Sequence, residues 1–189
     1  MKTFLTSDTH YFHKNVLIYS KRPYSSLEEM HESLINNWNE AVSAKDLVYH
    51  LGDFFISNKI EEIESILSRL NGTIRLIQGN HDKGWLKKIN RIPSAKKIEW
   101  VKPYHEIKVT EFDDIRKVCL MHYPLRSWNQ SHHGSCSFHG HCHSSLDNEN
   151  LSFRRLDIGV DGVAGFRPIE LKTAISIVRE RPMNNHHGD

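Results

Sequence analysis

The sequence predicts an α/β fold in which a parallel sheet packs against a second sheet. Three short apolar runs, separated by amphipathic helices, each stop at a polar turn: Lys2–Thr6, Asp46–Leu51 and Thr73–Gln78. From Ile98 onwards, further strand-like runs follow with no long helix between them. The 189 residues are enough for one domain with a substantial core. We therefore expect a single domain over residues 1–182, and a flexible tail over 183–189.

Apolar residues at helical spacing predict the two helices of the first half. We expect Ser26 to cap the first helix, with Glu29 as its capping-box partner, ahead of a stripe made of Met30, Leu34, Ile35, Trp38, Ala41 and Val42. The second helix covers Lys59–Leu70 and ends at Gly72. Residues 11–26 have no clear period and are expected to form a loop with one helical turn. This β-α-β-α-β order favours a parallel sheet, and ligands bind at the carboxyl ends of such strands.

The second half is predicted to form an antiparallel sheet. Its strand-like runs are Ile98–Val101, Glu106–Thr110, Lys117–Met121, Ser135–Phe138 and Arg154–Val160. The last apolar stretch, Ile169–Val178, is ambiguous between helix and strand.

Composition and charge favour a soluble protein without a nucleic-acid or membrane signature. Hydrophobic residues make up 38% and charged residues 25% of the chain, and the formal net charge is +2. No apolar run approaches membrane-spanning length, and the N-terminal run is too short and polar for a signal peptide. The three cysteines, Cys119, Cys136 and Cys142, lack the spacing of a disulfide framework. A cytoplasmic location is therefore expected.

The chain has fourteen histidines, and several of them follow predicted strands together with carboxylate or amide side chains. The groups at strand ends are Asp8, His10, Asp53, Asn80, His81, His122, His141 and His143. Because residues i and i+2 of a strand share a face, Asp8 and His10 can point in one direction, as can His141 and His143. By the same rule Cys142 is expected to point away from these ligands.

This mixture of imidazole nitrogen and carboxylate or amide oxygen predicts a transition-metal site. It suits Mn²⁺, our first choice, or Fe, Zn, Ni or Co better than Ca or Mg. Asp8, Asp53 and Asn80 supply oxygen, and four of the five histidines supply nitrogen. These seven ligands are too many for one ion with an open position, but they suit two ions that share a carboxylate.

The ordered blocks Asp-x-His, Gly-Asp, Gly-Asn-His-Asp, a lone His after a strand, and Gly-His-x-His resemble the calcineurin-like metallophosphoesterases. The resemblance extends from Asp8 to His143. It implies a four-layer α/β/β/α sandwich of two mixed sheets and a binuclear metal centre. One ion would be held by Asp8, His10, Asp53 and His143, and the other by Asp53, Asn80, His122 and His141.

The resemblance also implies a reaction, the hydrolysis of a phosphate mono- or diester by in-line attack of a metal-bridging hydroxide. Asp53 would bridge the ions, and His81, bound to neither, would protonate the leaving oxygen. Some relatives orient this histidine with an acidic residue after the Gly-Asp block, where this chain has Phe54-Phe55-Ile56. The orienting group is therefore open, with Asp82 only weakly supported.

Four further residues are candidates for substrate contacts or for ordinary solvated loop positions. They are His13, Asn15, Arg22 and Arg126. The short chain without appended domains favours a small phosphodiester or nucleotide over a protein substrate. One alternative is a non-catalytic metal-binding interaction module on the same scaffold. Another alternative is a zinc hydrolase or deaminase of a different fold. It lacks support, because this chain has no His-Glu-x-x-His or Pro-Cys-x-x-Cys block.

Overall fold

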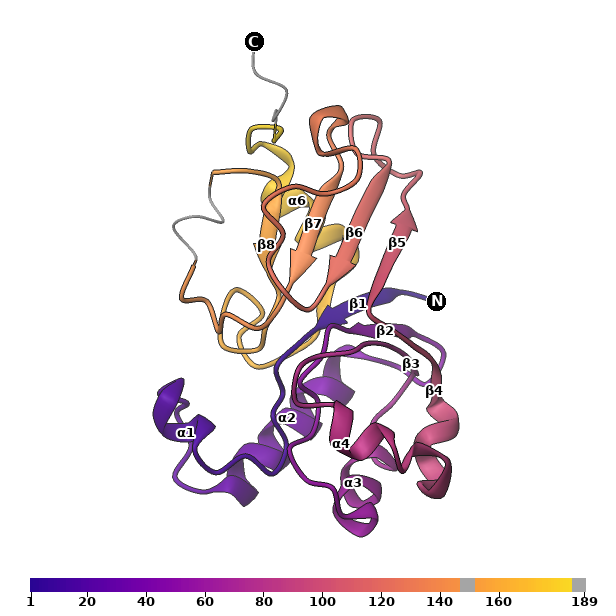
Figure 1. Cartoon of the computed structure of the whole chain (residues 1–189), viewed down its shortest axis with the longest axis vertical. Helices are drawn as coiled ribbons and strands as arrows, with labels where there is room; N and C mark the ends of the chain where they lie inside the picture. Colours follow the sequence, from indigo (N-terminus) through magenta and orange to yellow (C-terminus); the bar gives the residue numbers. More distant parts are fainter. Residues whose placement is uncertain (147–151, 185–189) are drawn as a thin grey trace.

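Two mixed β-sheets with flanking helices form the computed structural model, which describes residues 1–146 and 152–184. In Figure 1 the first sheet and helices α2, α3 and α4 occupy the lower half, and the second sheet and α6 occupy the upper half. The strands are β1 (Thr3–Thr6), β2 (Leu47–His50), β3 (Thr73–Ile77), β4 (Ile98–Lys102), β5 (Tyr104–Lys108), β6 (Lys117–Met121), β7 (Cys136–His139), β8 (Arg155–Asp157) and β9 (Ile169–Glu170). The α-helices are α1 (Val16–Tyr19), α2 (Leu27–Ala41), α3 (Ile60–Leu67), α4 (Lys83–Leu86) and α6 (Leu171–Arg179), and short 3₁₀ turns cover Ile89–Arg91, Pro93–Lys97 and Ser131–His133. The prediction of an α/β fold with two mixed sheets and flanking helices is confirmed.

The first sheet has the strand order β4-β3-β2-β1-β9, in which β1 to β4 are parallel and β9 is antiparallel to β1. The predicted parallel core of this sheet is confirmed. The run Ile98–Val101, predicted for the second sheet, instead belongs to β4 and extends the first sheet beside β3. The connection from β3 to β4 contains only short helical turns, so the sequence pattern there does not show the usual long crossover helix.

The second sheet has the order β5-β6-β7-β8. Only the β5–β6 pair is antiparallel, whereas β6, β7 and β8 run parallel. The prediction of an antiparallel second sheet is therefore wrong for two of its three strand pairs. Residues 122–135 cross from the end of β6 back to the start of β7 instead of forming a hairpin, as parallel pairing requires.

Alternating residues of the first sheet divide the apolar interior into two cores. Phe4, Val48 and Ile74 face α2 and α3, where they pack with Leu34, Trp38 and Ile63 among others. Leu5, Tyr49 and Ile77 face the opposite way and pack with β6, β7, β8 and the α6 residues Ala174, Ile175 and Val178. This alternation is what a strand period of two produces when both faces are covered. α2 begins as predicted, with Ser26 Oγ accepting the Glu29 N–H at 3.1 Å, although the Glu29 carboxylate accepts from Ser25 rather than Ser26.

The ambiguous stretch Ile169–Val178 contains both structures, since β9 leads directly into α6. Of the predicted tail, Asn184 is buried and donates to the Arg126 carbonyl oxygen at 2.7 Å, and residues 185–189 lie outside the described part. Within residues 1–146 and 152–184, no helix is both long and apolar enough to cross a membrane.

Candidate metal centre

Two groups of three potential metal ligands lie side by side where the two sheets meet. The first contains Asp8, His10 and His143, and the second contains Asp53, His122 and His141. Within each group the donor atoms lie within 4.8 Å of one another. Asp53 lies between the groups, because its Oδ2 is 3.5 Å from His122 Nε2 and 3.7 Å from His10 Nε2.

The topology explains why residues so distant in sequence meet. Asp8, Asp53 and Asn80 follow β1, β2 and β3, which are parallel neighbours, so their carboxyl ends share one edge of the first sheet. His122 follows β6, and His141 and His143 follow β7, which is parallel to β6. Figure 1 shows β6 and β7 running toward the junction at which β1 ends. Two contacts bridge the sheets there, from the His141 N–H to Asp8 Oδ2 at 2.9 Å and between His122 Nδ1 and the Leu51 carbonyl oxygen at 2.8 Å.

Five of the candidate ligands have a left-handed backbone, with φ of 57° at Asp8, 51° at His10, 54° at Asp53, 70° at His141 and 47° at His143. Each such residue costs on the order of 1–3 kcal/mol, and such residues cluster at functional sites. The expectation that strand geometry aligns the i and i+2 ligands is therefore wrong. Asp8 and His10 do meet, at 3.8 Å, but through a loop beyond β1.

The same backbone separates the other pair, since His141 and His143 enter different groups. Cys142, between them, is also among the residues that line the cavity. Its sulfur joins neither ligand group.

Two glycines allow the chain to pass very close to ligand carboxylates. A Cβ atom at Gly79 would lie 2.2 Å from Asp53 Oδ1, and one at Gly140 would lie 2.2 Å from Asp8 Oδ2. Only glycine fits such an approach.

Burial sets the protonation of the first group. It lowers the pKa of His10 to about 2, which keeps the imidazole neutral and its nitrogens available as ligands. It raises the pKa of Asp8 to about 7. Asp8 Oδ1 and His10 Nε2 are both buried without a hydrogen-bond partner among the described residues. An unpaired buried polar atom costs about 1–3 kcal/mol, and a cation between these two atoms would satisfy both. The residues of this site therefore fit a metal ion.

Contacts between ligands set the protonation of the second group. Burial alone would raise the pKa of Asp53, but its hydrogen bond with His122 and the charge of that ring bring it to about 2. Burial alone would lower the pKa of His122, but Asp53 and Asp8 bring it to about 8. Asn80 Oδ1 lies 3.0 Å from His122 Nε2, so the predicted amide ligand is in this group. With its Nδ1 beside the Leu51 carbonyl, His122 is free to present Nε2 to an ion.

His81 lies at the edge of the site and belongs to neither ligand group. Its side chain is 46% exposed, and its Nε2 is 3.9 Å from Asp53 Oδ2. Its backbone N–H donates to Asp53 Oδ1 at 2.9 Å. His81 is also among the residues that line the cavity beside the ligands.

Asp82 does not orient His81. It is fully buried, and its oxygens accept from the N–H groups of Gly79, Asp53 and Phe54 and from Trp85 Nε1, at 2.8–3.0 Å. Its carboxylate therefore joins the Gly52-Asp53 turn to the Gly79-Asn80 turn.

An open cavity of about 620 Å³ adjoins the ligands. Of the four predicted substrate contacts, His13 and Asn15 line it, whereas Arg22 and Arg126 do not. The Arg22 side chain is buried, with its donors bound to Asp161 and to backbone carbonyls, so its position does not support a substrate contact. Arg126 lines a separate hollow with Pro124 and Phe153.

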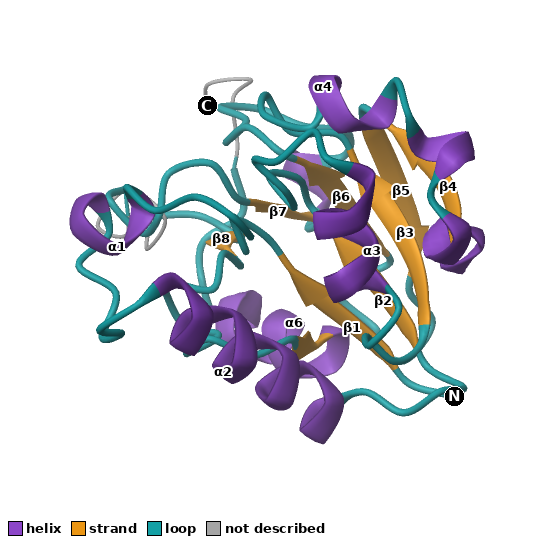
Figure 2. Ribbon diagram, turned by 90° about the horizontal axis from the view of Figure 1, so that it is seen from below, coloured by secondary structure: helices purple, strands orange, loops and turns teal. Residues whose placement is uncertain are grey.

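Sequence reasoning missed several residues at or beside this cavity. Tyr19, the last residue of α1, and Ser20, which follows it, line the cavity. Helix α1 lies beside the loops near β8 (Figure 2). Asp161, interpreted only as part of a turn, lies 2.6 Å from His143 Nδ1. No sequence period singles out these positions, because α1 has only four residues and Ser20 and Asp161 lie in turns.

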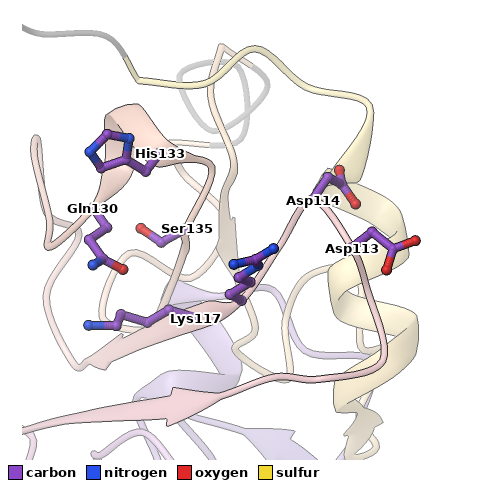
Figure 3. Close-up of a pocket in the computed structure, with 7 residues that line it drawn as sticks. Asp113, Asp114, Lys117, Gln130, His133 and Ser135 are labelled. Carbon is purple, nitrogen blue, oxygen red and sulfur yellow. The ribbon is translucent and has the colours of Figure 1, made fainter.

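Another hollow, of about 390 Å³, lies at the opposite end of β6. Figure 3 shows it lined by Asp113, Asp114, Lys117, Gln130, His133 and Ser135. None of the candidate ligands lines it. Lys117 begins β6 and His122 follows its last residue, so the hollow is separate from the metal centre.

The comparisons with known proteins agree with this geometry. The sequence profile of the calcineurin-like phosphoesterase superfamily domain matches residues 1–164. An uncharacterized protein of Methanocaldococcus jannaschii is 33% identical over 184 residues, which cover 95% of this chain and 92% of that protein.

Two solved structures are also similar. A protein of unknown function from Aquifex aeolicus superposes with a TM-score of 0.71 at 19% identity, over 94% of this chain and 99% of that one, which supports the fold. An archaeal phosphodiesterase has a TM-score of 0.39 at 23% identity, over 75% of this chain and 73% of that one. On the profile match over residues 1–164, the chain belongs to the calcineurin-like phosphoesterase superfamily.

Proposed function

We propose that the protein is a metal-dependent phosphoesterase with a binuclear centre. The observation that carries the proposal is the adjacency of two ligand groups on either side of Asp53. One ion would be held by Asp8, His10, Asp53 and His143, and the other by Asp53, Asn80, His122 and His141. Asp53 would be shared, since its Oδ2 lies 3.7 Å from His10 Nε2 of one set and 3.5 Å from His122 Nε2 of the other.

The donor types support divalent transition ions, with Mn²⁺ as the first choice and Fe, Zn, Ni or Co as alternatives. Two such ions would lower the pKa of a shared water and hold the phosphoryl oxygens, as phosphoester hydrolysis requires. The protein supplies the arrangement around them. Asp8 Oδ1 and His10 Nε2 are buried without a hydrogen-bond partner among the described residues, and five of the ligands have a left-handed backbone.

His81 is the proposed proton donor to the leaving oxygen. Proton transfer needs an ionisable group within reach of the substrate and not used as a ligand. His81 meets both conditions, since it lines the cavity, is outside both ligand groups and is partly exposed. Its backbone hydrogen bond to Asp53 ties its position to the metal ligands.

For the substrate we propose a small phosphodiester or a nucleotide. The cavity of about 620 Å³ accommodates a ligand of that size. Tyr19, which lines its mouth, is 74% exposed, and its ring lies 6.5 Å from the His13 ring, centroid to centroid. An exposed aromatic ring beside a phosphate site can stack on a nucleobase.

A non-catalytic metal-binding module on the same scaffold is the alternative. Such a module would need the ligands but no group poised for proton transfer. The position of His81 in the open cavity therefore favours the enzyme.

The proposal is tested by assaying metal-free protein on aryl phosphate mono- and diesters, with and without added Mn²⁺, followed by a panel of nucleotides. We expect turnover that depends on the ion. Folded protein that binds Mn²⁺ but hydrolyses no ester would favour the binding module, and folded protein that binds no divalent ion would contradict both.

A further inference from the structure

Two buried charged side chains lie next to His143: Asp161 contacts its imidazole, and Arg22 contacts Asp161. Asp161 Oδ2 lies 2.6 Å from His143 Nδ1, and the Asp161 side chain is only 5% exposed. Arg22 grips the same carboxylate with two hydrogen bonds, from Nε to Oδ1 at 2.7 Å and from Nη2 to Oδ2 at 2.8 Å. Ser20 Oγ also faces His143 Nδ1, at the longer distance of 3.2 Å.

Arg22 continues this chain of contacts to the other end of the same ligand group. Its Nη1 donates to the Thr9 carbonyl oxygen at 2.9 Å, and its Nη2 donates to the Asp8 carbonyl oxygen at 2.6 Å. The guanidinium is completely buried. One side chain thus fixes both the loop that carries Asp8 and His10 and the carboxylate that contacts His143.

The contact decides which nitrogen of His143 can bind a cation. A carboxylate accepts a hydrogen bond from an imidazole N–H, so Nδ1 carries the hydrogen and the lone pair is on Nε2. His143 stacks on His10, with ring centroids 5.0 Å apart, and its donor nitrogen is grouped with Asp8 and His10. The orientation of the ring and the position of its hydrogen are therefore set by Asp161.

We propose that Asp161 and Arg22 are positioning residues for the first metal site: Asp161 holds His143 with Nε2 toward the ion, and Arg22 holds Asp161 and the Asp8-Thr9 backbone in register with it. The inference rests on the proposed binuclear centre. It predicts selectivity, because neither residue contacts Asn80, His122 or His141 in the described hydrogen bonds and ion pairs.

A purely structural ion pair would not show this selectivity. Burying an ion pair has a large desolvation penalty, so apolar residues of similar volume often stabilise a fold to the same extent or more. A structural role also predicts equal losses at both metal sites. A positioning role predicts a loss at the first site alone.

The test measures Mn²⁺ binding to metal-free protein by calorimetry, comparing wild type with Asp161→Asn and Arg22→Lys. Loss of such a supporting partner costs about 10–100-fold in metal affinity. We expect that loss for one of the two ions in Asp161→Asn, with the affinity for the other unchanged. Asp114→Asn is the matched control, because Asp114 also pairs with two arginines, Arg154 and Arg179, but lies away from the centre. It should bind both ions as wild type does.

A second measurement does not depend on any variant folding. In ¹⁵N-labelled wild type loaded with Zn²⁺, the imidazole nitrogen shifts of His143 should show hydrogen on Nδ1 and the ion on Nε2. The opposite tautomer, or unchanged affinities in Asp161→Asn, or equal weakening of both sites, would overturn the inference and leave the binuclear centre intact. Wild type that binds no divalent ion would overturn both.

Discussion

Asp82 Oδ2 accepts the backbone N–H of Asp53 at 2.9 Å. The same oxygen accepts the N–H of Gly79 at 2.8 Å, and Oδ1 accepts from Phe54 and from the indole of Trp85, both at 3.0 Å. One buried carboxylate thus joins the turns after β2 and β3. Those turns carry Asp53, Asn80 and His81. The distances between the metal ligands and the proposed proton donor therefore depend on Asp82, although its carboxylate contacts none of their side chains.

Asp82→Asn should destabilise the fold strongly. The amide replaces one acceptor oxygen with a donor, which leaves two N–H groups facing it without a partner. Each unpaired buried group costs about 1–3 kcal/mol, so we expect a loss of at least about 2 kcal/mol in the free energy of unfolding, measured by urea denaturation of metal-free protein.

The matched control for this experiment is Asp113→Asn. Asp113 is exposed, and no hydrogen bond or ion pair involves its carboxylate in residues 1–146 and 152–184. Its substitution should leave the unfolding free energy unchanged. Equal stability of Asp82→Asn and wild type would show that the four hydrogen bonds do not hold the turns.

Glu106 should make folding stability depend on pH at acid values. Its ion pair with Lys117 at 2.6 Å, supported by Asn129 and Tyr104, lowers its pKa to about 2. The ordinary value is about 4.3. Because the folded-state pKa is the lower one, the stabilisation is fully present above about pH 4 and is lost as the pH falls toward 2.

The measurement is thermal unfolding of wild type and Glu106→Gln between pH 2 and 6. Wild type should unfold at the higher temperature at pH 6, and the difference should shrink steadily toward pH 2. A difference that is the same at every pH would mean that the charge of Glu106 does not stabilise the fold.

Tyr19 should contribute to the binding of a substrate that carries a base. Stacking on an aromatic side chain is worth about 1–3 kcal/mol per base, so Tyr19→Ala should raise KM for a nucleotide substrate about 10-fold, with little effect on a phosphate ester without a ring. Tyr19→Phe should behave as wild type.

Ile18→Ala is the control for Tyr19. Ile18 is equally exposed, at 74%, and comes from the same turn of helix, but it does not line the cavity. If Tyr19→Ala raised KM for both kinds of ester to the same extent, base stacking would be contradicted.

The sequence predicted the ligand residues better than the geometry that unites them. Polar groups after β1, β2 and β3 can be recognised because an apolar run that stops at Ser-Asp, Gly-Asp or Gly-Asn is a local pattern. The left-handed backbone of five ligands cannot be recognised in this way, because non-glycine residues adopt it only where the surrounding contacts force it. These ligands are Asp8, His10, Asp53, His141 and His143. That is why strand alternation paired His141 with His143, whereas the structure separates them.

Long-range partners were equally hidden. Arg22 was considered for substrate phosphate because arginine suits phosphate, but its partner Asp161 lies 139 residues away. Likewise β4 was assigned to the second half, because the strand pattern of Ile98–Lys102 does not reveal that it pairs with β3. Local sequence patterns predict helices and strands. Which strands pair, and which side chain a buried charge contacts, depends on residues far away in the sequence.

The proposed function requires that this chain hold two metal ions through Asp53 and use His81 for proton transfer. The most direct test is the metal content per chain, together with Mn²⁺-dependent turnover, of wild type, His81→Ala and Asp53→Asn. Wild type and His81→Ala should each bind two ions, with turnover lower by about 10²–10⁴-fold in His81→Ala, and Asp53→Asn should lose metal as well as activity. Equal metal loss in the two variants, or full turnover in His81→Ala, would contradict the account.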